Sequence, residues 1–256
     1  MLGAIIGDLS GSIYEYGQIK QVSNIKVNKL IEDNAFFSDD TILTIAILDA
    51  ILNDKDYNKY LKKYANEFMD YKPNIKPYFK TTFSPNFTKW SKENYIGKSS
   101  GNGAMMRISS VGYLFNSEEE VIENARLATI PSHNTKEAID CATLIALIIF
   151  YSRKGYNKNQ IIEKLKIKLN YKPFAKFNYT CYETLDNCLY ALFTSNSFEE
   201  SIRKVISYGG DTDTNACIVG SIAEEFYGID EKLKNQALEK IPVSFVKTLS
   251  KAYKNL

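Results

Sequence analysis

Two long runs in this sequence are apolar around nearly the whole circumference of a helix, and they constrain the fold more than any other feature. The runs are Thr41–Leu52 and Ala138–Tyr151. A helix without a polar face must be covered by other elements on most of its sides. A third segment, Asp213–Tyr227, places its apolar residues on one helical stripe, which indicates a helix that packs against the same core. We therefore expect these helices to lie at the centre of the protein.

Amphipathic helical segments account for most of the remaining chain. Few stretches alternate with the two-residue period of a strand, and Ile25–Leu30 is at best a short hairpin arm. A chain of 256 residues is long enough to bury a large core. The sequence thus predicts an all-α fold with one core, in a single domain over residues 1–256. The expected amphipathic helices are Tyr57–Tyr71, Glu118–Thr129, Lys158–Leu169, Tyr179–Phe193, Phe198–Ser207, Glu231–Lys240 and Ser244–Tyr253.

Composition narrows the class of protein. The net charge of +2 argues against nucleic-acid binding by bulk electrostatics. No apolar run is long enough to span a bilayer, and the N-terminal segment lacks the basic leader of a signal peptide. We therefore expect a cytoplasmic protein, a monomer without a membrane partner. Four cysteines without CxxC spacing are expected to be reduced core residues, and they are Cys141, Cys181, Cys188 and Cys217.

Two short acidic clusters stand at the starts of the expected helices Thr41–Leu52 and Asp213–Tyr227. They are Ser38-Asp39-Asp40-Thr41 and Asp211-Thr212-Asp213-Thr214. Burying carboxylates without a partner is costly, so the two clusters are expected to converge into one oxygen-rich cage for hard divalent cations such as Mg²⁺. The alternative is ordinary N-capping, in which Asp, Ser and Thr satisfy the free amides of a helix start.

Glycine spacing near the N-terminus predicts a close helix contact. Gly3, Gly7, Gly11 and Glu15 recur every four residues, so they share one face of a first helix. Such a face lets another backbone approach closely, and Glu15 then stands at the end of the groove. For Glu15 alone, a surface carboxylate is the simpler alternative. Asp8 is expected to be structural, bonded to nearby backbone.

Further candidate residues lie in the irregular parts of the chain. The small residues Gly101, Asn102 and Gly103 precede a helix, and such turns can bind phosphate through backbone N–H groups, although a plain turn is the alternative. His133 follows a proline in an expected capping turn, where neighbours can satisfy it. As the only histidine, it excludes a histidine-rich zinc site. The long aromatic segment Lys72–Asn102 is expected to be a substrate-facing loop.

Five segments of the chain resemble those of a known protein family. The segments GDLSGSIYE, FSDDT, GNGAMMR, SHNTKEA and YGGDTDTNA, in this order, are similar to the signature segments of the ADP-ribosylglycohydrolases. The resemblance covers residues 1 to about 230. It implies an all-α orthogonal bundle and a binuclear Mg²⁺ centre, sometimes Mn²⁺, that cleaves the bond between ADP-ribose and an acceptor.

The resemblance also implies roles for individual residues. One of Glu15, Asp39 and Asp213 would act as the general base or acid, and the sequence does not decide which. Ser38 departs from the threonine usual in the family but keeps the hydroxyl oxygen, and Ala104-Met105 replaces a commoner pair of small residues. The implied metal ligands are Ser38, Asp39, Asp40, Asp211, Asp213 and Thr214, and the implied substrate contacts are Gly101, Asn102, Gly103 and His133.

These features predict a metal-dependent hydrolase that removes ADP-ribose from a modified acceptor. Arginine, serine, O-acetyl-ADP-ribose and a nucleic-acid end all stay open as acceptors, and nucleic acid enters only as such a substrate. One rival is a non-catalytic ADP-ribose-binding or crystallin-like relative, which should have lost some ligands. A second rival, a metal-dependent phosphohydrolase, lacks the histidine pair that would support it, because His133 stands alone.

Overall fold

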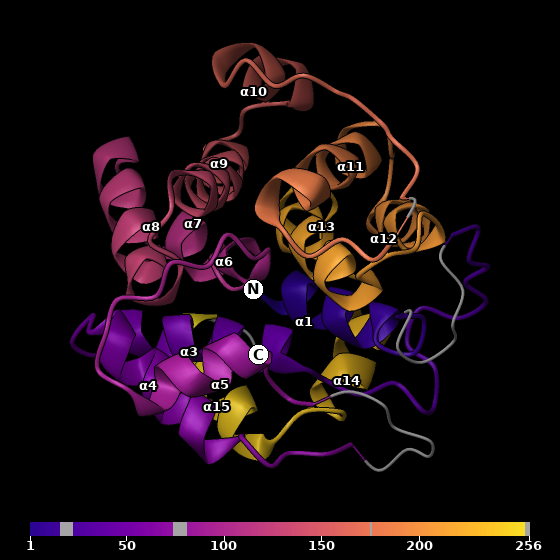
Figure 1. Cartoon of the computed structure of the whole chain (residues 1–256). Coiled ribbons are helices and arrows are strands. Elements are labelled where there is room, and N and C mark those ends of the chain that lie inside the picture. Colours follow the sequence, from indigo (N-terminus) through magenta and orange to yellow (C-terminus); the bar gives the residue numbers. More distant parts are fainter. Residues whose placement is uncertain (16–22, 74–80, 175, 254–256) are drawn as a thin grey trace.

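Helices form the secondary structure throughout the part of the chain that the structure describes, as predicted (Figure 1). This computed structural model describes residues 1–15, 23–73, 81–174 and 176–253. In chain order the helices are α1 (Leu2–Gly11), α3 (Asp39–Leu52), α4 (Tyr57–Glu67), α5 (Pro85–Lys92), α6 (Gly103–Met106), α7 (Ser109–Leu114), α8 (Glu118–His133), α9 (Lys136–Arg153), α10 (Lys158–Lys164), α11 (Cys181–Phe193), α12 (Phe198–Ser207), α13 (Thr212–Tyr227), α14 (Glu231–Leu238) and α15 (Val243–Ala252).

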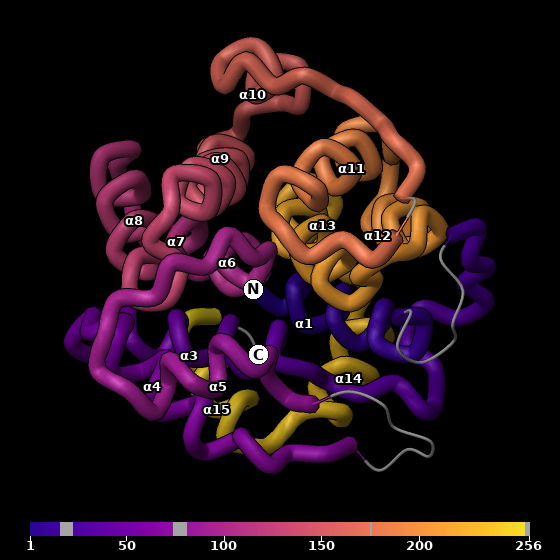
Figure 2. The backbone as a smooth tube through the Cα atoms, in the orientation of Figure 1, coloured from indigo at the N-terminus to yellow at the C-terminus, as the bar shows by residue number. Residues whose placement is uncertain are grey.

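The pair α1 and α13 lies in the middle of the molecule, with the other helices around it (Figure 2). A Cβ built on Gly3 would lie 2.1 Å from the carbonyl oxygen of Gly220, and one built on Gly11 would lie 2.2 Å from that of Thr212. The residue numbers run in opposite directions, so the two helices are antiparallel. The predicted close approach along the glycine face is therefore confirmed, and it sets the end of α1 against the start of α13.

The apolar runs are buried as predicted. In α3 and α9 most residues are inaccessible to solvent, and the buried apolar side chains of the described residues form one contiguous cluster. Burying one leucine or isoleucine side chain contributes about 1.5–3 kcal/mol, so this cluster supplies the main favourable term in folding. All four cysteines are free and buried, also as predicted.

Several expected boundaries are wrong. The segment Lys72–Asn102 contains α5, which begins with Ser84 accepting a hydrogen bond from the amide of Phe87 and with proline in its first turn. A proline at that position costs no hydrogen bond, because the amide there has no helical partner. Ile25–Leu30 forms no strand in the described structure.

Two further boundaries concern candidate site residues. Helix α1 ends at Gly11, so Glu15 lies in the turn that follows rather than on the helix. Helix α8 runs through Pro131 and ends at His133, instead of stopping before it. The proline lies in the last turn, where the lost amide interrupts only one helical hydrogen bond.

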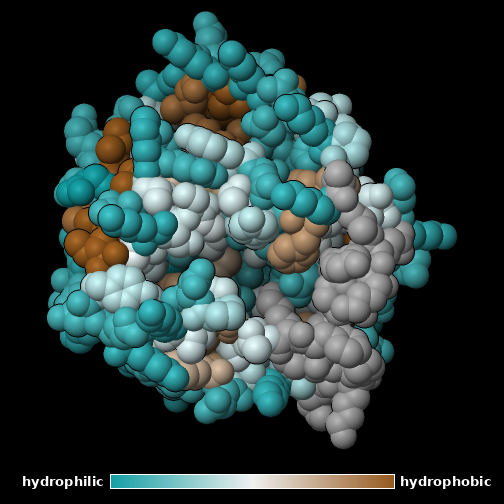
Figure 3. Space-filling view, viewed as in Figure 1, coloured by the Kyte–Doolittle hydropathy of each residue, from teal (hydrophilic) through white to brown (hydrophobic). Residues whose placement is uncertain are grey.

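No helix in the described ranges combines the length and the apolar character needed to cross a membrane. Figure 3 shows hydrophilic residues over most of one face, with a hollow near its middle and hydrophobic residues in small areas near α8 and α10.

Candidate metal centre and ligand cleft

The carboxylate of Asp8 joins α1 to the start of α3. Its Oδ2 atom accepts hydrogen bonds from the backbone amides of Ser38, at 2.9 Å, and Thr41, at 3.1 Å. The Ser38 hydroxyl donates to Oδ1 at 2.8 Å. These amides belong to the first turn of α3, where a negative charge is favourable. The structure thus confirms that Asp8 bonds to backbone, although the backbone is that of another helix.

The second acidic cluster does not serve as a simple helix cap. Asp211 stands at the N-cap position of α13, but its side chain makes no capping hydrogen bond. Instead its Oδ2 atom accepts a hydrogen bond from Asn102 Nδ2 at 2.8 Å. Its amide donates to Asn178 Oδ1, also at 2.8 Å. Ordinary N-capping therefore does not explain the carboxylate at this position.

The turn before Asp211 has the backbone geometry that its glycines allow. Gly209 and Gly210 have φ values of 81° and 71°, a region that glycine occupies without strain. A Cβ on Gly210 would lie 2.1 Å from Asn178 Oδ1. Asn215 steadies the same turn, because its Nδ2 atom donates to the carbonyl of Gly209 at 3.1 Å. The turn fixes the direction in which α13 begins.

The two acidic clusters converge, as predicted. Asp8, Asp40 and Asp213 bring carboxylate oxygens within 4.8 Å of one another, and so do Glu15, Asp211 and Asp213. All five residues are buried, and Asp213 belongs to both groups. We refer to these five residues as the carboxylate cluster. Its members come from α1, the turn after α1, and the starts of α3 and α13.

Electrostatic repulsion within the carboxylate cluster is visible in Asp8. Burial, and then the charge of Asp213, raise the pKa of Asp8 to about 7, against the lowering effect of hydrogen bonds from Thr41 and Ser38. A divalent cation would relieve both causes by supplying positive charge to buried oxygen ligands. Oxygen-only donor sets suit hard cations such as Mg²⁺, Mn²⁺ or Ca²⁺. The residues present therefore fit a metal centre.

The two predicted hydroxyl ligands lie beside the carboxylate cluster. Ser38 Oγ lies 3.0 Å from Asp40 Oδ2, and Thr214 Oγ1 donates to the same oxygen at 3.2 Å. Ser38 also accepts a hydrogen bond from the amide of Asp40, so it caps α3 as well. Asp39 belongs to neither group of three carboxylates and lines the neighbouring cleft.

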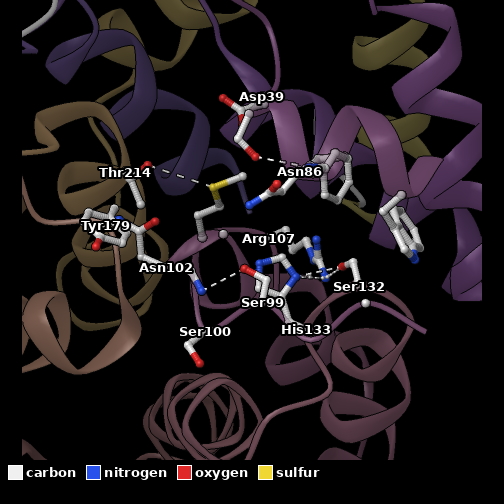
Figure 4. A pocket seen from close by; sticks show the side chains of 18 of the residues that line it. Asp39, Asn86, Ser99, Ser100, Asn102, Arg107, Ser132, His133, Tyr179 and Thr214 are labelled. Carbon is white, nitrogen blue, oxygen red and sulfur yellow. Dashed lines mark hydrogen bonds between the residues drawn. The ribbon is translucent and has the colours of Figure 1, made fainter. Parts of the chain in front are cut away.

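A cleft of about 750 Å³ opens beside the carboxylate cluster, within the usual volume of a small-molecule site. Asp39 and Thr214 lie on one side of it, and Ser99 and His133 on the other (Figure 4). Part of α5 also lines the cleft, including the ring of Trp90. The cleft therefore connects the acidic centre to an aromatic wall.

The predicted turn at Gly101, Asn102 and Gly103 borders the cleft, but two of its amides are already used. The Gly101 amide donates to Ser99 Oγ at 3.0 Å, and the Asn102 amide donates to the carbonyl of Tyr179 at 2.9 Å. The expectation of free amides is wrong at these two positions. The turn instead meets the carboxylate cluster through the Asn102 side chain.

The end of α8 brings His133 to this turn. Carbonyls in the last helical turn lack helical partners. Here those of Pro131 and Ser132 accept hydrogen bonds from the amides of Gly97, at 2.9 Å, and Ser99, at 3.3 Å. A Cβ on Gly101 would lie 3.5 Å from His133 Nε2. The imidazole therefore lies directly against the turn.

Sequence reasoning missed four residues that support the site. Two of them, Asn178 and Asn215, hold the turn before α13. Asn178 lies outside the expected helices, and Asn215 lies within the segment YGGDTDTNA. The other two contact His133. Arg107 is the last residue of the segment GNGAMMR, and Ser132 immediately precedes His133 at the end of α8. The four residues are Asn178, Asn215, Arg107 and Ser132.

Known proteins resemble this chain along most of its length. The chain is 26% identical to protein L543 of Acanthamoeba polyphaga mimivirus, a predicted ADP-ribosyl glycohydrolase, over 94% of this chain and 91% of that protein. It is 20% identical to the ADP-ribosylhydrolase ARH3 of Mus musculus, over 90% and 83% of the two chains. The fold is also similar to a solved structure described as an ADP-ribosylglycohydrolase-related protein complex. The two match over 96% of this chain and 90% of that chain, with a TM-score of 0.69 and 18% identity.

The protein is thus a helical hydrolase that acts on glycosyl bonds. It belongs to the ADP-ribosylglycohydrolase family, whose sequence profile matches residues 1–253. The predicted family and the predicted helical fold are both confirmed.

Proposed function

We propose that this protein uses two divalent cations, Mg²⁺ or Mn²⁺, to hydrolyse the bond between the anomeric carbon of a distal ribose and an acceptor, releasing ADP-ribose. The observation that carries this function is the carboxylate cluster, five buried acidic residues at one end of a cleft of about 750 Å³. Family membership and relatives named as ADP-ribosylhydrolases support the substrate class.

The carboxylate cluster provides two sets of ligands for the proposed cations. One set consists of Asp8, Asp40 and Asp213, and the other consists of Asp211 and Asp213, with the Glu15 carboxylate next to them. Asp213 belongs to both sets, and the hydroxyls of Ser38 and Thr214, which lie beside Asp40, would complete the ligands. Asp39 stays a predicted ligand or base on the cleft wall. When bound, the cations would hold vicinal ribose hydroxyls and polarise the attacking water.

Glu15 is proposed to act on the reaction more than on metal retention. It approaches from the turn after α1, while α1 itself and the starts of α3 and α13 supply the other carboxylates. We expect Glu15→Gln to lower turnover by about 10²–10⁴-fold, the usual contribution of a positioned acid or base, with Mg²⁺ binding retained. Turnover assays and Mg²⁺ calorimetry on the same sample would measure both effects. Normal turnover restored by excess Mg²⁺ would make Glu15 a ligand only.

Gly103 tests the proposed contact between the turn and the diphosphate or distal ribose. A Cβ there would lie 3.6 Å from His133 Nε2 and 3.7 Å from Met106 Cε, which is ordinary contact. The fold therefore tolerates a side chain at this position, while the larger Gly103→Val would fill the space beside His133. We expect weaker ADP-ribose binding in calorimetry and an unchanged thermal midpoint. Unchanged affinity would exclude the turn as part of the binding site.

The direct test of the function is a panel of ADP-ribose conjugates. Peptides modified on arginine or serine, O-acetyl-ADP-ribose and a modified nucleic-acid end would be incubated with the protein in Mg²⁺ and in EDTA. We expect mass spectrometry to detect free ADP-ribose from at least one conjugate in Mg²⁺ and none in EDTA. Tight ADP-ribose binding without release from any conjugate would favour the rival, a non-catalytic binding protein.

A further inference from the structure

Arg107 is a buried cation on the wall of the cleft. Its side chain is 0% exposed and lies among the residues that line the cleft. No described carboxylate lies within ion-pair distance of it, and its Nε and Nη1 atoms make no hydrogen bond with the described residues. The Phe87 ring lies 6.0 Å from its Cζ atom. Burying a cation without a carboxylate partner is costly, and burial lowers the pKa of Arg107 to about 9. The burial of this guanidinium therefore indicates a specific role for Arg107.

The shortest hydrogen bond of Arg107 leads to the imidazole. Its Nη2 atom donates to Ser132 Oγ at 2.8 Å and to the carbonyl of Ala128 at 3.4 Å, and it lies 3.5 Å from His133 Nδ1. Ser132 Oγ in turn lies 2.8 Å from the same Nδ1 atom. Figure 4 shows the three side chains together beside the cleft.

The chemistry of the three groups determines which atom donates and which accepts in each of these hydrogen bonds. A guanidinium has donors and no acceptor, so Ser132 Oγ accepts from Arg107. The serine hydroxyl proton is then available to His133 Nδ1. Arg107 faces the same nitrogen, and a protonated Nδ1 would oppose both donors. The contacts therefore favour an unprotonated Nδ1 and a proton on Nε2. In agreement, burial and then the charge of Arg107 lower the pKa of His133 well below its ordinary value, which keeps the ring neutral.

The opposite side of the ring faces the turn that borders the cleft. Positions for a Cβ on Gly101 and Gly103 lie 3.5 Å and 3.6 Å from His133 Nε2. A ligand seated on this turn would therefore meet an N–H group. Hydrogen bonds to charged acceptors contribute more than neutral ones, so a phosphate oxygen is the acceptor that gains most from this donor.

The geometry points to Arg107 as a positioning residue that acts through Ser132 to hold His133 as the neutral tautomer with its proton on Nε2, presented to a phosphate oxygen of the ligand. The tautomer is a property of the free protein. Only the identity of the acceptor, an oxygen of the ADP-ribose diphosphate, rests on the proposed function.

The single histidine makes the tautomer directly measurable. Protein labelled with ¹⁵N-histidine would give one pair of imidazole nitrogen resonances in a long-range ¹H–¹⁵N correlation, recorded without ligand. We expect Nδ1 in the range of an unprotonated nitrogen and Nε2 in that of a protonated one. A proton on Nδ1 in the wild-type protein would overturn the assignment.

Two variants remove the contacts that fix the tautomer. Arg107→Met keeps much of the buried volume, and replacing a buried charge by an apolar side chain is often tolerated. Ser132→Ala is smaller and provides the same test if the first variant does not fold. Both are expected to move the two nitrogen resonances towards each other, as the second tautomer becomes populated. Resonances unchanged in a folded Ser132→Ala and a folded Arg107→Met would contradict the positioning role.

Matched controls separate this role from general effects. Arg126→Met changes an exposed arginine of α8 that pairs with Glu123, and we expect wild-type resonances. In ADP-ribose calorimetry, His133→Leu should bind about 10- to 100-fold more weakly, the loss of one charge-assisted hydrogen bond. His133→Gln, which keeps an N–H donor, should lose less.

The binding experiments and the tautomer measurement distinguish a failure of the His133 assignment from a failure of the proposed function. Equal losses in His133→Leu and His133→Gln would contradict the donor role of Nε2. The predicted tautomer in a protein that binds no ADP-ribose would instead contradict the proposed function.

Discussion

Alanine at position 7 is expected to destabilise the folded protein by about 3 kcal/mol or more, at or above the upper end for an overpacked core. Its Cβ would lie 2.0 Å from the carbonyl oxygen of Ala216 and 2.6 Å from the amide nitrogen of Cys217. These are backbone atoms of α13, so no side chain can rotate away and the two central helices must separate. Urea unfolding would measure the loss.

Gly103→Ala is the matched control for this prediction, because its Cβ would make only ordinary contacts. We expect its unfolding midpoint to stay close to that of the wild-type protein. Equal midpoints for Gly7→Ala and Gly103→Ala would contradict the close packing of α1 against α13.

Asp213→Asn is expected to lower turnover by at least about a thousandfold, because several kcal/mol of metal-dependent stabilisation would be lost. Asp213 is the one member shared by both groups of the carboxylate cluster. Asparagine keeps the shape of the side chain, so the start of α13 should be preserved. Without metal, the variant should be at least as stable as the wild-type protein, because the charge of Asp213 raises the pKa of Asp8.

Turnover, Mg²⁺ calorimetry and thermal unfolding in EDTA would measure these effects. Asp140→Asn, on the exposed surface of α9, serves as the control and should leave all three unchanged. Near-normal turnover of Asp213→Asn in Mg²⁺ would show that the centre is misassigned.

The sequence predicts the central architecture because its determinants are local. The four-residue glycine spacing marks the face of α1 that meets α13, and the apolar runs mark α3 and α9 as buried helices. In contrast, the sequence predicts a loop where α5 forms, because the helix start at Ser84-Pro85 lies among aromatic residues and prolines that are typical of loops. A short amphipathic helix among such residues has too few turns for its period to stand out.

The site is predictable only in part, for a similar reason. The acidic residues at the two helix starts can be recognised in the sequence, because carboxylates before apolar runs are unusual. Asp8 lies within an apolar helix, and nothing in the local sequence shows that α3 and α13 bring it two carboxylate neighbours. The same holds for Asn178 and Arg107, whose roles depend on partners 33 and 25 residues away. Tertiary contacts of this kind produce no periodic pattern in the amino-acid sequence.

The most direct test of the metal centre is anomalous scattering from crystals grown with Mn²⁺. We expect two manganese peaks within coordination distance of the carboxylate cluster, one beside Asp40 and one beside Asp211, with Asp213 between them. Peaks elsewhere on the protein, or no peak at these residues in crystals that contain Mn²⁺, would contradict the central claim that the two acidic helix starts form one metal site.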